Sequence, residues 1–151
     1  MANKKTGFHQ WVDLMEKASE YITEEKVLVD SPEKVAMFLR PLVKDELQER
    51  MYVICLNSKS RVIHFECTSV GTVDRTICHP RDIFRMAIAK NAVKIILTHN
   101  HPSGDPSPSI ADVECTNNMK EAGKILQIQV VDHVIIGDGK KFYSFAQNDI
   151  M

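Results

Sequence analysis

The chemistry of this chain is concentrated in two histidines, a serine and an aspartate that follow one another closely. His99, His101, Ser109 and Asp112 form the pattern H-x-H-P-x6-S-x-x-D. On an extended strand the two histidines point to the same face, with alpha carbons roughly 6–7 Å apart. A catalytic zinc ion takes three protein ligands and keeps a fourth position for water. The two imidazoles and the Asp112 carboxylate therefore predict a hydrolytic zinc site.

The Ser109-x-x-Asp112 segment has two interpretations. It stands where a helix is expected to begin, so that Asp112 lies in the first turn and projects toward the preceding loop. The aligned backbone dipoles of that turn favour an ionised carboxylate, which a metal ion needs. The alternative is a helix cap, because Ser-x-x-Asp resembles a capping box, although Glu or Gln is preferred at the last position. The two histidines upstream favour the metal site.

A hydrolytic site also needs a base that accepts the proton of the attacking water. Glu49 is a candidate because it begins an apolar segment, 49–57, that is expected to be a strand. The alternative is a solvated charge at the strand end. Asp45, Glu46 and Glu66 are rivals, and spacing alone does not choose among the four carboxylates.

Hydrophobic periodicity predicts the elements that position these residues. Helices are expected at 8–28, from Ser31-Pro32 onward, at 81–91 and at 110–126, and strands at 49–57, 61–66, 93–98, 129–136 and 141–145. Strands that alternate with helices indicate an α/β or α+β fold, with a mixed sheet flanked by helices. Each helix is expected to bury one apolar face. For the helices at 81–91 and 110–126 these faces are Ile83, Phe84, Ala87 and Ile88, and Ile110, Val113, Ala122, Ile125 and Leu126.

Composition indicates one ordinary globular domain, with 151 residues of which 44% are hydrophobic and 26% charged. A net charge of -1 supplies no overall attraction to nucleic acid or to a membrane surface. The N-terminus has no apolar signal segment, and no stretch approaches the length of a membrane-spanning helix. The four cysteines form no C-x-x-C pair, which favours reduced thiols over disulfides. We therefore expect a soluble protein of the cytoplasm.

The chain from about residue 46 to 147 resembles the RadC-like branch of the JAB/MPN (JAMM) metalloprotease family. The matching segments are QERMYVICLN (48–57), HPRDIFRMAIAKNA (79–92), IILTHNHPSGDPSPSIAD (95–112) and VVDHVIIG (130–137). The family pattern of a strand-borne Glu followed by H-x-H-P-x6-S-x-x-D is present without a substitution. The resemblance implies a curved mixed sheet between helices, cytidine-deaminase-like in outline. We assign it to residues 46–151, after an N-terminal helical segment at 1–45.

This resemblance also implies roles for individual residues. His99, His101 and Asp112 would bind zinc, and Glu49, rather than its rivals, would be the general acid/base. Ser109 would polarise the scissile carbonyl or stabilise the oxyanion. The implied activity is hydrolysis of a peptide or isopeptide bond in a protein or peptide substrate.

Other functions are less favoured. RadC proteins often carry an N-terminal helix-hairpin-helix module, which needs glycines in its hairpin, and only Gly7 precedes Gly71. A DNA-repair role and a nucleic-acid partner are therefore not favoured. The main alternative is a non-enzymatic DNA-repair or mobile-element accessory protein that keeps the metal site for stability. A nucleobase deaminase would need P-C-x-x-C, which the chain lacks.

Structural roles are favoured for three further residues outside the motif. Asp132 and His133 are neighbours on a strand and point to opposite faces, so at most one of them faces the site. A structural hydrogen bond is favoured for this pair over support of a metal ligand. Cys115 follows Asp112 by three residues, and a buried thiol is favoured there over metal ligation.

Overall fold

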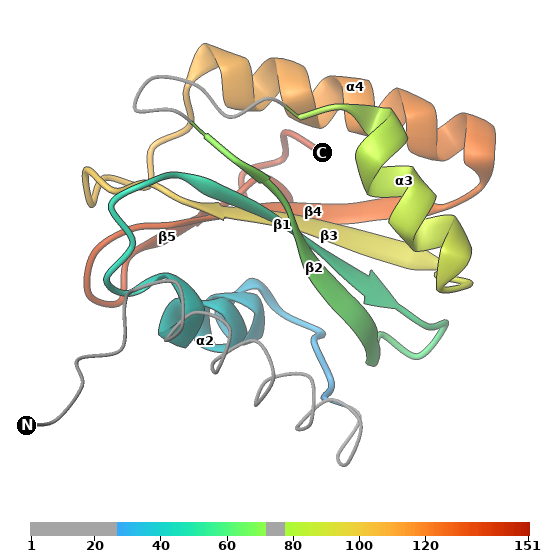
Figure 1. Ribbon diagram of the computed structural model, residues 1–151, viewed down its shortest axis with the longest axis horizontal. Helices are drawn as coiled ribbons and strands as arrows, with labels where there is room; N and C mark the ends of the chain where they lie inside the picture. Colours follow the sequence, from blue (N-terminus) through green and yellow to red (C-terminus); the bar gives the residue numbers. More distant parts are fainter. Residues whose placement is uncertain (1–26, 72–77) are drawn as a thin grey trace, which may run out of the picture.

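The computed structural model describes residues 27–71 and 78–151. Its centre is a single mixed β-sheet, with helix α2 on one face and helices α3 and α4 on the other (Figure 1). The helix expected at 8–28 lies outside the described residues except at its end, where Leu28 forms an isolated bridge to Arg61. Within the described ranges, none of the helices combines the length and apolar character that crossing a bilayer requires.

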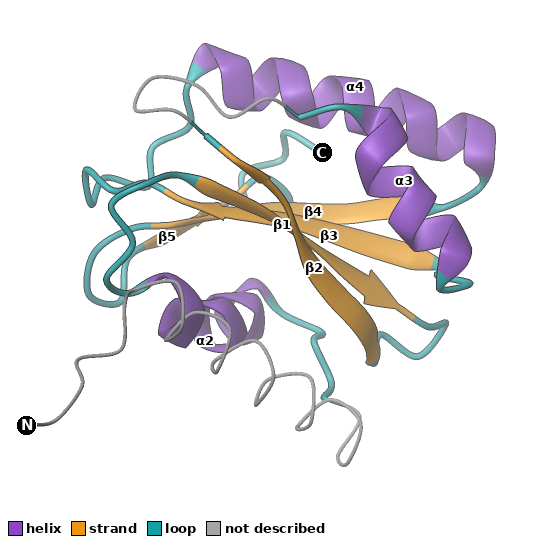
Figure 2. Ribbon diagram, in the orientation of Figure 1, coloured by secondary structure: helices purple, strands orange, loops and turns teal. Residues whose placement is uncertain are grey.

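Five strands form the sheet in the spatial order β2-β1-β3-β4-β5 (Figure 2). Their bounds are Arg50–Leu56 for β1, Val62–Val70 for β2, Lys94–Asn100 for β3, Gln129–Ile136 for β4 and Phe142–Ser144 for β5. Strand β1 is antiparallel to both β2 and β3, whereas β3 and β4 are parallel and joined by α4. This arrangement confirms the predicted mixed sheet flanked by helices.

The central strands β1 and β3 are buried on both faces, which suits their nearly continuous apolar runs. On one face Tyr52 and Ile54 of β1 pack with Leu39 of α2 in one apolar cluster. On the other face Met51 and Val53 pack in a second cluster under α3 and α4. Successive residues of one strand thus serve two cores, because strand side chains alternate between faces.

The helices begin where the sequence predicts. Helix α2 (Pro32–Val43) is capped by Ser31, whose hydroxyl accepts from Lys34 N, and proline occupies the first turn. Helix α3 spans Pro80–Ala89 and helix α4 spans Ile110–Leu126. The division into segments at 1–45 and 46–151 stays a prediction.

The buried face predicted for α4 is wrong at three of its five residues, while Val113 and Ala122 are partly buried. Among its apolar residues, Ile110 is 81% and Ile125 is 83% exposed, and Leu126 is exposed as well. The residues that α4 buries are Asp112, Thr116, Met119 and Gly123. The hydropathy pattern does not predict this buried face, because the face contains two polar residues and a glycine. The same error affects α3, where Ile88 is exposed while Ile83, Phe84 and Ala87 are buried as predicted.

A close approach between Gly123 and the backbone of Ile128 explains why α4 buries a different face from the one predicted. A Cβ atom on Gly123 would lie 2.6 Å from the backbone oxygen of Ile128, so only glycine allows the end of the helix to approach this closely. At the other end of the helix Asp112 faces the histidines of β3. These two contacts set the orientation of α4, and its outer isoleucines are left in solvent.

Candidate metal centre

Three segments distant in sequence meet at one end of the sheet (Figure 1). His99 lies near the end of β3 and His101 follows that strand directly, while Asp112 lies in the first turn of α4. Because β1 runs antiparallel to β3 with Met51 opposite His99, the pairing extended by two residues puts Glu49 beside His101. Strand register therefore brings the glutamate to the histidines.

The four side chains converge on a small volume. Their ligand atoms all lie within 4.8 Å of one another. His99 Nε2 is 3.2 Å from Asp112 Oδ1, and His101 Nε2 is 3.4 Å from Asp112 Oδ2. His99 Nε2 also lies 3.0 Å from His101 Nε2 and 3.7 Å from Glu49 Oε1. The structure thus brings together all three predicted ligands and the predicted base.

The rival carboxylates are engaged elsewhere or exposed. Glu46 forms an ion pair with Arg50, with 2.8 Å between Oε2 and Nε. Glu66 lies 3.5 Å from His64 on β2, and Asp45 is exposed. The cluster among the described residues that could hold a metal ion contains Glu49 and none of these three.

The donor set suits a cation. His101 Nδ1 lies 2.9 Å from the backbone oxygen of Asp105, which can only accept, so the ring hydrogen is on Nδ1 and Nε2 carries a lone pair. That lone pair faces His99 Nε2 and a carboxylate oxygen at the distances given above. Two imidazole nitrogens and a carboxylate are a usual ligand set for catalytic zinc. A divalent cation would relieve the crowding of electron pairs at this point.

Electrostatics keep the carboxylate ionised. Burial alone would raise the pKa of Asp112, but the imidazoles of His101 and His99 beside the carboxylate outweigh burial and hold this pKa well below its usual value. Burial, the largest single effect, would lower the pKa of His101, but the Asp112 carboxylate and the backbone oxygen of Asp105 together outweigh it and raise the pKa above 6.5. A proton and a bound cation would therefore compete for the electron pairs of these imidazole nitrogens and of the Asp112 carboxylate.

Ser109 orients the Asp112 carboxylate. Its hydroxyl donates to Asp112 Oδ2 at 2.7 Å and accepts from Asp112 N at 3.2 Å, while Ser109 N donates to the same carboxylate oxygen at 2.7 Å. This is the capping box that the sequence suggested as an alternative. The capping box and the predicted ligand position are compatible, because Asp112 Oδ1 still faces His99.

Asn100 fixes the backbone around Glu49, a role that the sequence analysis did not identify. Its Oδ1 accepts from Arg50 N at 2.8 Å, and its Nδ2 donates to Gln48 O at 3.1 Å. These are the backbone groups on either side of Glu49, whose own carbonyl accepts from Gly71 N at 2.8 Å. The only sequence signal is a buried amide between two histidines, on the opposite face of the strand.

The Asp132-His133 pair divides its contacts between the two faces. Asp132 accepts from Ser144 Oγ at 2.6 Å and from Ala146 N at 2.9 Å, which fits the favoured structural interpretation. His133 instead contacts the site, with Nε2 at 2.8 Å from His99 Nδ1. Burial raises the pKa of Asp132 and lowers the pKa of His133 well below its ordinary value.

Cys115 lies near this centre but outside the cluster of ligand atoms. Its thiol forms a hydrogen bond with Cys78, which together with burial raises the pKa of Cys115. The group within the described residues that could hold a metal ion contains no cysteine. A protonated, partly buried thiol is the state that the sequence analysis favoured at this position.

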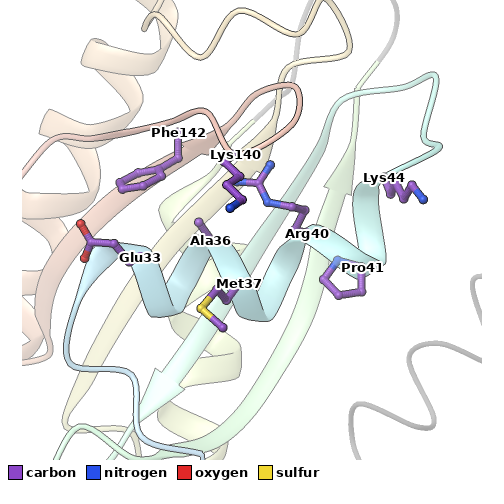
Figure 3. Close-up of a pocket in the computed structure, with 8 residues that line it drawn as sticks. All are labelled: Glu33, Ala36, Met37, Arg40, Pro41, Lys44, Lys140 and Phe142. Atoms are coloured by element: carbon purple, nitrogen blue, oxygen red, sulfur yellow. The ribbon is translucent and has the colours of Figure 1, made fainter.

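A groove lined by other residues lies away from this centre. A hollow of about 740 Å³ follows α2 and the start of β5, with Met37 and Phe142 among its apolar residues (Figure 3). Glu49, His99, His101 and Asp112 are absent from its lining. The lining consists of Glu33, Ala36, Met37, Arg40, Pro41, Lys44, Lys140 and Phe142.

A smaller hollow adjoins the candidate centre. It has a volume of about 200 Å³, and His101 and Asn100 form part of its wall with the turn between β4 and β5.

Fold and site together define a class of protein: an α+β domain with a mixed sheet that gathers two histidines, an aspartate and a glutamate where a metal ion could bind. A family model described as the RadC-like JAB domain matches residues 29–150. The chain therefore belongs to the RadC-like JAB domain family.

Relatives from several organisms support this assignment. The chain is 48% identical over 116 residues to a UPF0758 protein of Caldanaerobacter subterraneus, covering 77% of this chain and 50% of that protein. It is 43% identical over 139 residues to a UPF0758 protein of Clostridium kluyveri, with coverage of 92% and 60%. A third UPF0758 protein, from Methanosarcina barkeri, is 38% identical over 128 residues, with coverage of 85% and 56%. The chain thus spans little more than half the length of these relatives.

Proposed function

We propose that this protein is a zinc-dependent hydrolase of the JAMM type that cleaves a peptide or isopeptide bond in a protein or peptide substrate. The observation that carries the proposal is the convergence of Glu49, His99, His101 and Asp112 within 4.8 Å. Membership of the RadC-like JAB domain family supports it. A protein substrate is proposed rather than nucleic acid, because a net charge of -1 supplies no overall attraction to phosphates.

In this proposal each residue has one task. His99, His101 and Asp112 would hold the cation, which when bound would polarise the scissile carbonyl and acidify a water molecule. Glu49 would accept the proton of the attacking water and return it to the leaving amine. Its side chain is 23% exposed and borders the ligand atoms, so it is close enough to act and open enough to meet substrate.

Ser109 is proposed to donate a hydrogen bond to the oxyanion. Its hydroxyl hydrogen is directed at Asp112 Oδ2, so donation to a substrate oxygen requires this hydroxyl to rotate. The position at the start of α4 suits the role, because the helix N-terminus favours negative charge.

The proposal is tested by measuring zinc content and cleavage together. We expect about one zinc per chain in the wild type and in Glu49→Gln, because Gln keeps the shape of the side chain and the three ligands are unchanged. Cleavage of a mixture of unfolded proteins and isopeptide-linked peptides should fall roughly 10²–10⁴-fold in Glu49→Gln, the usual contribution of a general acid/base. His101→Ala and Asp112→Ala should lose both zinc and cleavage.

Glu66→Gln is the matched control, since Glu66 lies on β2 outside the cluster. This variant should keep both zinc and cleavage. A wild-type protein that takes up no zinc, or a Glu49→Gln variant that cleaves at the wild-type rate, would contradict the proposal.

A further inference from the structure

A chain of buried hydrogen bonds leads from His99 back to the element that supplies Asp112. His99 Nδ1 is 2.8 Å from His133 Nε2, and His133 Nδ1 is 2.6 Å from Thr116 Oγ1. Thr116 Oγ1 then donates to the backbone oxygen of Asp112 at 2.7 Å. His99, His133 and Thr116 are at most 1% exposed, so bulk water does not compete for these groups.

The direction of every hydrogen bond in this chain follows from the backbone oxygen at its end. A carbonyl oxygen can only accept, so the hydroxyl hydrogen of Thr116 points to Asp112 O. The hydroxyl oxygen is then an acceptor, which places the hydrogen of a neutral His133 ring on Nδ1 and leaves a lone pair on Nε2. His133 Nε2 can in turn only accept, so His99 donates from Nδ1.

This leaves a lone pair on His99 Nε2, the atom that faces Asp112 and His101. A neutral imidazole carries its single ring hydrogen on either nitrogen, and only the bare nitrogen binds a metal ion. The ring of His133 is further held by Phe145, which stacks on it with 4.9 Å between centroids and 12° between planes. The chain of hydrogen bonds is therefore rigid as well as directional.

We propose that Thr116 and His133 are positioning residues that hold His99 in the tautomer able to bind a metal ion. The inference rests on the proposed metal site, and it adds two residues that contact neither the cation nor a substrate. Helix α4 would then support metal binding in two ways. The Asp112 carboxylate would be a ligand, and the Asp112 carbonyl would orient His99 through this chain of hydrogen bonds.

Thr116→Val and Thr116→Ser test the proposal. Valine keeps the shape of threonine but removes the acceptor for His133 Nδ1, so the His133 hydrogen is free to move to Nε2 and donate to His99. His99 must then carry its hydrogen on Nε2, the ligand atom. Loss of a partner that orients a metal ligand typically weakens metal affinity about 10–100-fold, which we expect for Thr116→Val. Thr116→Ser keeps the hydroxyl and should bind zinc like the wild type.

Thr98→Val is the matched control. Thr98 is also a fully buried threonine, but it points to the opposite face of β3, and its hydroxyl has no hydrogen-bond partner within the described part of the chain. Its zinc affinity should equal that of the wild type. If Thr116→Val fails to fold, His133→Gln, whose amide oxygen can still accept from His99, is compared with His133→Leu, which cannot accept.

A second readout needs neither zinc nor activity. Nitrogen NMR of the metal-free wild type should place the His99 ring hydrogen on Nδ1, and in Thr116→Val on Nε2. A His99 hydrogen on Nε2 in the wild type overturns the inference, as does equal zinc affinity in Thr116→Val and Thr116→Ser. A wild type with the expected tautomer that binds no zinc would instead refute the proposed function, and Thr116 and His133 would still set the His99 tautomer.

Discussion

At the proposed metal site a proton and a cation would compete for the same nitrogen of His101. Although burial favours the neutral ring, the Asp112 carboxylate and the backbone oxygen of Asp105 together raise the pKa of His101 above 6.5, while the pKa of Asp112 is held low. In the metal-free protein this shift stabilises the folded state below about pH 6.5, and the contribution is lost as the pH rises through the raised pKa. Cation binding shows the opposite trend, because it requires the deprotonated ring.

We therefore expect zinc affinity to increase with pH and to level off only above the raised pKa of His101. Below that pKa one competing proton lowers the affinity about tenfold per pH unit. Competition with a coloured chelator between about pH 5.5 and 8.5 measures this slope, within the range where histidine titrates. His64→Gln, at a histidine paired with Glu66 outside the cluster, should leave the slope unchanged. A zinc affinity that is constant over this range would show that His101 Nε2 is not a ligand atom.

At the scale of elements, the loop between β3 and α4 determines where His101 and Asp112 meet. Gly104 turns this loop with a φ of +85°, and it connects to the β4–β5 turn through a hydrogen bond from Asp138 N to Gly104 O. The next residue, Asp105, supplies the carbonyl that accepts from His101 Nδ1. A change of backbone conformation at Gly104 would therefore alter the position of His101, a proposed metal ligand.

Gly104→Ala should cost about 1–2 kcal/mol of folding free energy, because an L side chain is strained at positive φ. The same substitution should also weaken zinc affinity. Gly139→Ala is the matched control, since Gly139 has a φ of +56° and open space around its missing Cβ atom. It should lower the free energy of unfolding in urea only by the cost of positive φ, without the close contact that a Cβ atom on Gly104 would make with the Asp138 carboxylate, and it should leave zinc affinity intact. If both variants bind zinc equally, the loop conformation does not control the His101 position.

Local patterns predicted the elements well. The helix expected at 110–126 and the strand expected at 129–136 match α4 and β4. The predicted ligand set from His99 to Asp112 could be recognised for the same reason. These residues belong to one continuous segment made of a strand, a loop and the start of a helix. Asn100 and His133 were not assigned to the site, because their contacts depend on which strands pair and in what register. Such non-local contacts leave no periodic pattern in a single sequence.

At the scale of the whole molecule, the candidate centre lies at one end of elements that the second apolar core already packs together. Glu49 precedes β1, His99 ends β3, and Asp112 begins α4. A cation bound to the histidines and Asp112 would join the sheet to the helix that covers it, and any ligand that binds only the folded state stabilises that state. Metal binding should therefore be visible as a global change in stability rather than only as a local one.

Zinc should raise the unfolding temperature of the wild type. At a free zinc concentration about 100-fold above Kd the gain is about 2.7 kcal/mol. For a chain of this size that corresponds to an increase of about 5–10 °C. The four reduced cysteines can also bind zinc, including in the unfolded chain, so the wild type alone is not decisive. Asp112→Asn is the control, because the amide oxygen of asparagine can still accept from Ser109 N in the capping box but lacks the charge that a ligand carboxylate provides. Calorimetry of both proteins with and without zinc should show a clearly smaller increase in Asp112→Asn, and equal increases would place the bound zinc at the thiols instead of the histidines.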